Sequence, residues 1–339
     1  KGKADGGGGF WVVGSATADA LVHLVGTIVR LCEATIGGGA FYLQGNGGSA
    51  TLVLEDSTLE SNKAADHGGA VAAFAGGKVQ VAGGTTSYVK NNLATTGDGG
   101  GIFMQGGSSL TVSGVDTKLV VDGNTAQLNG GGVSAVGAAT VTVSSGAHLD
   151  VTNNKALTFH GGGFNLMDEG TRLDVHGEGT QLIVRGNEAK LNGGGLALQA
   201  GAVVRITAPS TFQSNTAIEG HGGGVAYDDN DGKDDGGSSC VRLELVVFID
   251  GNVNALPGLQ IYTAPNSPLS SINDLDAVAN KKTTWCVPCG KYTLVAGTRF
   301  TNVYLPKQSY VQLSVQRGIG TSDDDLILVN TEVRTKGAT

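Results

Sequence analysis

Two cysteines near the C-terminal end form the motif that most resembles a reactive site. The segment 285–289, Trp-Cys-Val-Pro-Cys, has the Cys-x-x-Cys spacing of a thioredoxin-type redox box. Such a box needs its first thiolate at the N-terminus of a helix, where the thiol pKa is lowered. Residues 290–294 are instead typical of a turn followed by a strand, so we predict that Cys286 is not a redox nucleophile. A disulfide among Cys240, Cys286 and Cys289 is the alternative, and its pairing stays open.

Histidines and acidic residues are the other candidate metal ligands. His67, His160 and His221 each precede a run of glycines, and because they are far apart along the chain we interpret them as turn residues. The segment 228–235 is acidic, but EF-hand spacing would place Tyr227 at its first ligand and no Glu closes the loop. We interpret this segment as a solvated acidic loop and predict neither a metal nor a cofactor.

These residues are set in a repeat of about 31 residues, marked by an apolar anchor after each glycine-rich run. The anchors are Phe10, Phe41, Val71, Ile102, Val133, Phe164, Leu196 and Val225. A period of this length is typical of solenoids, in which each repeat stacks on the next. One clear unit predicts three short strands, at 164–167, 172–176 and 181–185. We therefore predict an all-β protein whose residues 1–262 form a right-handed single-stranded parallel β-helix of about eight coils.

Asparagine recurs at a second position of the repeat. The series comprises Asn62, Asn92, Asn124, Asn154, Asn187, Asn215 and, after a longer gap, Asn252. A buried side-chain amide must find hydrogen-bond partners, and stacking of the coils supplies them. We predict that these residues form a structural ladder, with Cys32 in the matching place of an early unit as a buried free thiol.

Composition limits the possible partners. The 339 residues include 57 Gly but only 6 Pro, and 15% are charged, which is typical of many short strands rather than of a disordered chain. The net charge is −8 without a cluster of Lys and Arg, so we expect no nucleic-acid partner. No apolar run of about 18 residues predicts a membrane span. The chain opens with Lys-Gly-Lys, and we interpret it as a processed piece of a longer protein.

Residues one and three positions after each anchor are predicted to point away from the core. The only charge in these outward positions is Asp228, so we see no pair of carboxylates suited to glycoside cleavage and no catalytic residues. The first four units carry aromatic residues there instead: Trp11, Tyr42, Phe74 and Phe103. Such a stripe in a chain with only 5% aromatic residues indicates a contact surface for a subunit, an appended domain or a glycan. The alternative is that long turns of the chain cover it.

Two short motifs alternate along the repeat. Residues 212–215, Phe-Gln-Ser-Asn, and residues 68–71, Gly-Gly-Ala-Val, resemble the F-x-x-N and G-G-A-[ILV] motifs of the chlamydial polymorphic outer membrane protein repeat. The resemblance covers roughly residues 5–260. In that family the repeats form surface-exposed β-helical adhesins, and similar repeats occur in surface proteins of algae and protists. The resemblance implies an extracellular role at the cell surface, and residues 286–292 look like the opening of a small Cys-rich extracellular module.

We therefore expect a non-enzymatic structural or adhesive module of a larger extracellular assembly. Its partners would be copies of itself or neighbouring subunits, with glycan contact as a further option. One alternative is a subunit of an extracellular filament such as a flagellar appendage, and another is a polysaccharide lyase or hydrolase, because many β-helices are such enzymes. Residues 263–339 are expected to form a β-rich cap or second module, since the last coil of a β-helix needs its open end covered.

Overall fold

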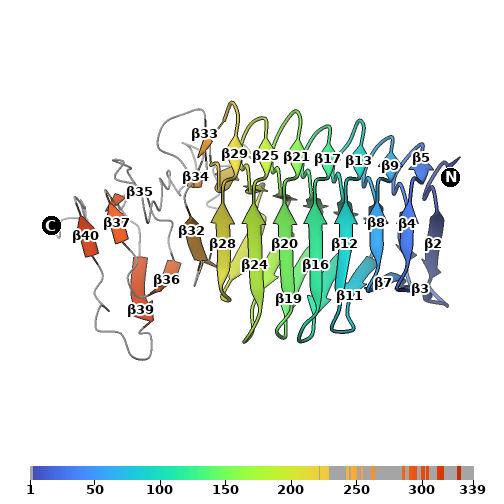
Figure 1. Ribbon diagram of the computed structural model, residues 1–339, viewed down its shortest axis with the longest axis horizontal. Coiled ribbons are helices and arrows are strands. Elements are labelled where there is room, and N and C mark those ends of the chain that lie inside the picture. Colours follow the sequence, from blue (N-terminus) through green and yellow to red (C-terminus); the bar gives the residue numbers. More distant parts are fainter. Residues whose placement is uncertain are drawn as a thin grey trace.

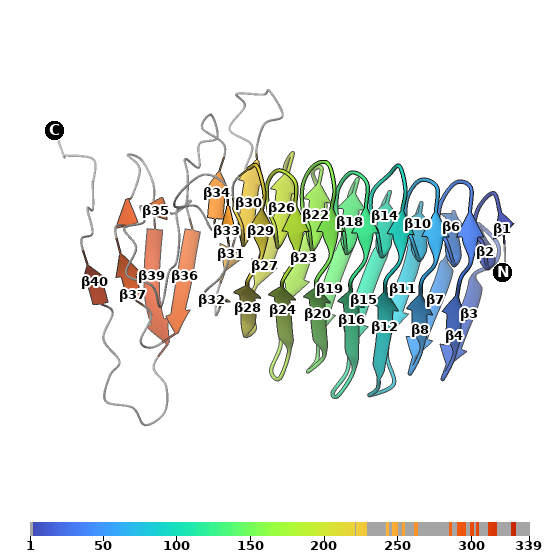
Figure 2. The same cartoon turned by 45° about the horizontal axis from the view of Figure 1, so that its top comes forward.

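The computed structural model describes residues 3–220 and 222–228 continuously and, beyond these, only short strands between residues 242 and 329. Side chains are described for residues 5–220 and 222–226. The described part is all-β, and most of its strands belong to four parallel sheets, which we call A to D (Figures 1 and 2). It contains no helix of the length and apolarity that a membrane crossing requires.

The four sheets are built from strands that recur in the same order along the chain. Sheet A comprises β1 (Lys3–Ala4), β5 (Glu33–Ala34), β9 (Lys63–Ala64), β13 (Leu93–Ala94), β17 (Thr125–Ala126), β21 (Lys155–Ala156), β25 (Glu188–Ala189), β29 (Thr216–Ala217) and β33 (Val253–Asn254). Sheet B comprises β2 (Phe10–Ser15), β6 (Phe41–Asn46), β10 (Val71–Phe74), β14 (Ile102–Gln105), β18 (Val133–Val136), β22 (Phe164–Met167), β26 (Leu196–Gln199), β30 (Val225–Asp228) and β34 (Ile261–Thr263).

Sheets C and D complete each coil. Sheet C comprises β3 (Ala20–Val25), β7 (Ala50–Glu55), β11 (Gly77–Val81), β15 (Ser109–Ser113), β19 (Thr140–Ser144), β23 (Arg172–Val175), β27 (Val203–Ile206) and β31 (Arg242–Leu243). Sheet D comprises β4 (Ile28–Arg30), β8 (Thr58–Glu60), β12 (Thr86–Lys90), β16 (Lys118–Asp122), β20 (His148–Thr152), β24 (Gln181–Arg185), β28 (Ser210–Gln213) and β32 (Val246–Ile249).

The chain passes through A, B, C and D in turn, so β1 to β28 form seven complete coils and β29 to β34 continue the same order. The predicted parallel β-helix is confirmed. Figure 1 shows the strands of sheet D side by side along the rod, and Figure 2 brings sheet B into view. The predicted strands at 164–167 and 181–185 match β22 and β24. The predicted strand at 172–176 corresponds to β23, which ends one residue earlier, at Val175. Each coil has four strands, not the three that were expected. The strand that was missed belongs to sheet A and has only two residues.

The core lies inside the coils and consists almost entirely of aliphatic side chains. Anchors such as Val71 and Phe164 are fully buried, as are the residues two positions later, such as Leu43 and Leu166. Because successive residues of a strand point to opposite faces, alternate positions of sheets B, C and D all reach this core. Phe10 is the exception at 42% exposure, since the described chain places no coil on its outer side.

Glycine pairs let the chain turn from sheet A into sheet B. The first glycine of each pair has a positive φ, for example 69° at Gly161, a conformation that glycine adopts without steric cost. The second glycine lies against the backbone of the next coil: a Cβ on Gly162 would be 2.5 Å from the backbone N of Glu188. The two glycines therefore have different roles, one in the turn and one in the close approach of coils.

The strands after the repeats pair in parallel as well. They are β35 (Trp285–Cys286), β36 (Gly290–Val295), β37 (Arg299–Thr301), β38 (Val303–Tyr304), β39 (Val311–Gln316) and β40 (Ile327–Val329), paired as β35–β38, β36–β39 and β37–β40. The domain boundary at 262 and the cap stay predictions. The acidic loop after Asp228, His221, Asn252, Cys240 and Cys289 lie outside the described residues, as does the side chain of Cys286.

Candidate functional site

The Asn ladder runs through six consecutive coils at the corner between sheets D and A. The backbone N and Nδ2 of Asn62 both donate to Oδ1 of Asn92, at 2.9 and 3.0 Å. The same two bonds join Asn92 to Asn124 and continue to Asn215. Each Nδ2 also donates to a carbonyl of the preceding coil, as Asn154 does to Val121 at 2.9 Å. From Asn62 to Asn187 the ladder therefore uses both donors and the acceptor of each buried amide.

Cys32 fills the ladder position that precedes Asn62, as predicted. Its backbone N donates to Oδ1 of Asn62 at 3.1 Å, and its thiol is free and buried. A thiol lacks the amide that would carry the ladder further. The residue before each ladder position has a positive φ, including Leu31 at 57° and Asn153 at 54°, so the corner has the same backbone shape whichever residue fills the ladder position.

A second ladder, which we call the loop ladder, lies just before the glycine pairs and comprises His67, Asp98, Asn129, His160 and Asn192. The Asp98 backbone N donates to Nδ1 of His67 at 3.0 Å, and the Asn129 backbone N donates to Oδ1 of Asp98 at 2.8 Å. His160 and Asn192 continue the pattern. His67 and His160, which were interpreted as turn residues, thus fasten coils together. The sequence signal that could have revealed the loop ladder is the spacing of 31 or 32 residues between its successive members.

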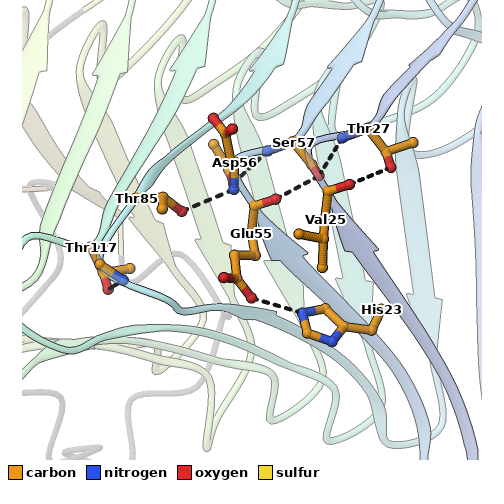
Figure 3. A network of polar contacts seen from close by, with 10 residues as sticks. His23, Val25, Thr27, Glu55, Asp56, Ser57, Thr85 and Thr117 are labelled. Carbon is orange, nitrogen blue, oxygen red and sulfur yellow. Dashed lines mark hydrogen bonds and ion pairs between the residues drawn. The ribbon is translucent and has the colours of Figure 1, made fainter.

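Hydroxyl groups form a third set of inter-coil contacts where sheet C turns into sheet D. The Thr27 backbone N donates to Oγ of Ser57 at 3.1 Å (Figure 3). Nearby, His23 Nε2 lies 3.1 Å from Glu55 Oε2. The Ser57 backbone N in turn donates to Oγ of Ser87 at 3.2 Å. Further contacts of this kind join Thr85 to Asp56, Thr117 to Gly84 and Thr180 to Gly146. A similar contact joins Thr171 to Ala138 where sheet B turns into sheet C.

The four aromatic residues meet on the outer side of sheet B. Trp11 lies edge-on to Tyr42 with ring centroids 5.6 Å apart, and Tyr42 stacks on Phe74 at 5.0 Å. Phe74 reaches Phe103 at 5.5 Å. Phe74 stands two residues along the strand from the position that Trp11, Tyr42 and Phe103 share. The predicted stripe is therefore a zigzag of contacting rings across the first four coils.

Exposure of these rings falls from the first coil to the fourth. Trp11 is 60% exposed, Tyr42 and Phe74 are half-buried, and Phe103 is only 2% exposed because the His67 ring stacks on it at 4.3 Å. In later coils the same outward position is buried as well, and a Cβ on Gly130 would lie 2.7 Å from Cβ of Ser134. Of the two alternatives, covering by a loop of the chain applies to Phe103, which lies beneath the loop between sheets A and B, while Trp11 remains exposed.

Burial raises the pKa of Tyr42 above its usual value of 10.0. A raised pKa means that the folded state retains the phenolic proton after the unfolded state has lost it, so this contribution to stability is complete below pH 10 and lost as pH rises further. We expect the melting temperature to fall less between pH 9 and 11 in Tyr42→Phe than in the unaltered chain. Equal slopes in thermal melts of the two proteins would contradict this.

Charged side chains on the outer faces pair with those of neighbouring coils. Glu60 lies 3.7 Å from Arg30 and 3.2 Å from Lys90, which belong to the coils on either side. Lys118 lies 2.6 Å from Asp150. Within the described residues no three His, Cys, Asp or Glu side chains are grouped to hold a metal ion. Exposed pairs add little stability, and here they join matching positions of successive coils.

Comparison of the chain with protein-family models, with curated proteins and with solved structures finds no match. The resemblance of the repeat to the chlamydial family therefore stays a prediction.

Proposed function

We propose that this chain is a non-enzymatic structural rod in an extracellular assembly at the cell surface. The observation that carries the proposal is the use of its polar side chains to join successive coils. The Asn ladder, the loop ladder and the hydroxyl contacts each span several coils at a different corner. Because each coil contacts only its neighbours, such fastening decides whether a solenoid stays continuous along its length.

The charges of the described coils support the same proposal. A glycoside-cleaving site needs two carboxylates on either side of the bond to be broken. Here Glu60 and Asp150 each form an ion pair with an Arg or Lys side chain of a neighbouring coil. The outward positions of sheet B are mostly apolar or uncharged. These side chains link coils, and a rigid rod of this kind would hold other parts of an assembly at a defined separation.

The proposal is tested by locating the protein on the cells that produce it. Antibodies against the chain should label intact, unpermeabilised cells, and electron microscopy should show the label at regular positions. Labelling that requires permeabilisation would contradict the extracellular role. Turnover of an acidic or neutral polysaccharide by the purified chain would contradict the structural role and favour an enzyme.

A further inference from the structure

The outward face of sheet C carries an array of hydroxyl groups in the middle of the rod. Alternate residues of β15 and β19, in the fourth and fifth coils, point away from the core and are half-buried. They are Ser109, Thr111, Ser113, Thr140, Thr142 and Ser144. The two strands pair in register, so each of the six lies beside a hydroxyl residue of the other strand. We call these six residues the hydroxyl patch.

The hydroxyls of the patch do not hold the fold together. Within the part of the chain whose side chains are described, none of the six has a hydrogen-bond partner in the protein. Hydroxyls at the turns differ, because Ser57 and Thr117 each accept a backbone N–H of the preceding coil. A hydroxyl can both donate and accept, so the patch offers six such groups to solvent or to a ligand.

The patch is not a requirement of the repeat. On one side, Ser109 and Thr111 pair in register with Lys78 and Gln80 of the third coil. On the other side, β19 pairs with β23 of the sixth coil, whose outward residues are charged. Threonine favours strands, but these neighbours show that long and charged side chains fit the same sheet. Small hydroxyl residues at all six positions therefore need another reason.

Basic residues flank the patch on both sides along the rod. Lys78 lies in the coil before it, and Arg172 and Arg205 lie in the two coils after it. Asp174, the one acidic residue at the outward positions of β11 to β27 in this sheet, lies 3.2 Å from Nε of Arg172. Three positive charges and one negative charge give this face +2, on a chain whose net charge is −8.

Two of these bases have no ion pair with a described carboxylate. Nζ of Lys78 donates to Oγ of Ser49 at 2.7 Å, and Arg205 is exposed. Their charges are therefore available to an anionic ligand that lies over the patch.

We propose that the outward face of sheet C binds a linear polysaccharide that carries carboxylate groups. The proposal rests on the extracellular structural role proposed above and names a ligand for it. Hydroxyls of the sugar and of the patch pair with one another, since each can donate and accept. Lys78 and Arg205 supply the charge opposite to the carboxylates, which the guanidinium group matches in geometry as well.

The composition of this face argues against two other classes of partner. Protein interfaces are enriched in aromatic residues and depleted in serine, whereas the centre here consists of hydroxyls. Single-stranded nucleic acids stack their bases on aromatic side chains, and the outward positions of β11, β15, β19, β23 and β27 hold none. Parallel strands are about 4.8 Å apart and alternate residues about 6.6 Å apart, so the patch presents its hydroxyls at regular intervals to a repeating polymer.

Native electrophoresis of the 339-residue chain through gels that contain polygalacturonate tests the proposal. We expect polygalacturonate to retard the chain and uncharged dextran to leave its mobility unchanged. Thr111→Val/Thr142→Val retains branched side chains that favour strands. It should raise the dissociation constant about five-fold or more, because two hydrogen bonds are lost. The matched control Thr58→Val/Thr211→Val changes two half-buried threonines of sheet D and should bind as the unaltered chain does.

A second pair of variants tests the charges. Lys78→Gln/Arg205→Gln should raise the dissociation constant about ten-fold or more, because hydrogen bonds to charged groups contribute more than neutral ones. Lys63→Gln/Arg185→Gln removes two exposed bases from sheets A and D. It changes the net charge equally and should bind as the unaltered chain does.

Mobility unaffected by polygalacturonate, or equal binding by the patch variant and the unaltered chain, would overturn the proposal. Stronger retardation by dextran sulfate than by polygalacturonate would assign the face to charge alone and would also overturn it. If antibodies still label intact cells in these cases, the structural role survives without this ligand. Release of reducing ends from polygalacturonate would instead contradict the structural role itself.

Discussion

Replacing Asn154 with leucine is expected to lower the free energy of unfolding by about 3 kcal/mol or more, since three buried polar groups lose a partner at about 1–3 kcal/mol each. The backbone N and Nδ2 of Asn124 lose their common acceptor, 2.9 Å away in both cases. The carbonyl of Val121 loses the Nδ2 that donates to it. Asn154 is fully buried, so water does not readily replace these bonds. Urea unfolding followed by circular dichroism measures the effect.

The neighbouring residue provides a matched control. Asn153 has a φ of 54°, and glycine occupies the same place before the ladder at Gly123 and Gly186. Asn153→Gly removes an amide as well, but its hydrogen bond to Asp122 is exposed, so we expect a change within about 0.5 kcal/mol. If Asn154→Leu unfolds at the same urea concentration as Asn153→Gly, the ladder does not hold the coils together.

The sequence predicted the parts of the fold that have a detectable period. Anchors such as Phe164 recur in every unit and asparagines such as Asn154 in six successive units, and both of these residues are buried where the pattern placed them. Sheet A was missed because a two-residue strand such as Lys155–Ala156 cannot show the alternation by which strands are recognised. Its presence follows only from the pairing of neighbouring coils.

The candidate site was predicted less completely, because its exposure depends on contacts between coils. The outward direction of Trp11 and Phe103 follows from alternation along a strand. That Phe103 lies beneath His67 of the preceding loop depends on how that loop folds over sheet B.

Gly162→Ala is the second substitution for which a large effect is expected, about 3 kcal/mol or more, at the upper end of what overpacking costs. The added methyl group would overlap the carbonyl O of Gly194 and lie 2.5 Å from the backbone C and N of Glu188. These are backbone atoms of the next coil, which cannot rotate away as a flexible side chain can. The coils would have to separate where the backbone N of Gly162 donates to the Gly193 carbonyl.

Gly106→Ala is the control that distinguishes overlap between coils from the strain of placing a side chain at a positive φ. Gly106 has a φ of 64°, yet alanine occupies the same position of two other coils at Ala75 and Ala200, with φ of 49° and 47°. A Cβ on Gly106 would meet only Ala75, at 3.5 Å or more, so this variant should cost about 1–2 kcal/mol. Because Gly162 has no positive φ, a larger loss of stability there than at Gly106 would have to come from the separation of coils. Equal losses in urea unfolding would mean that the close approach of the backbones does not require glycine.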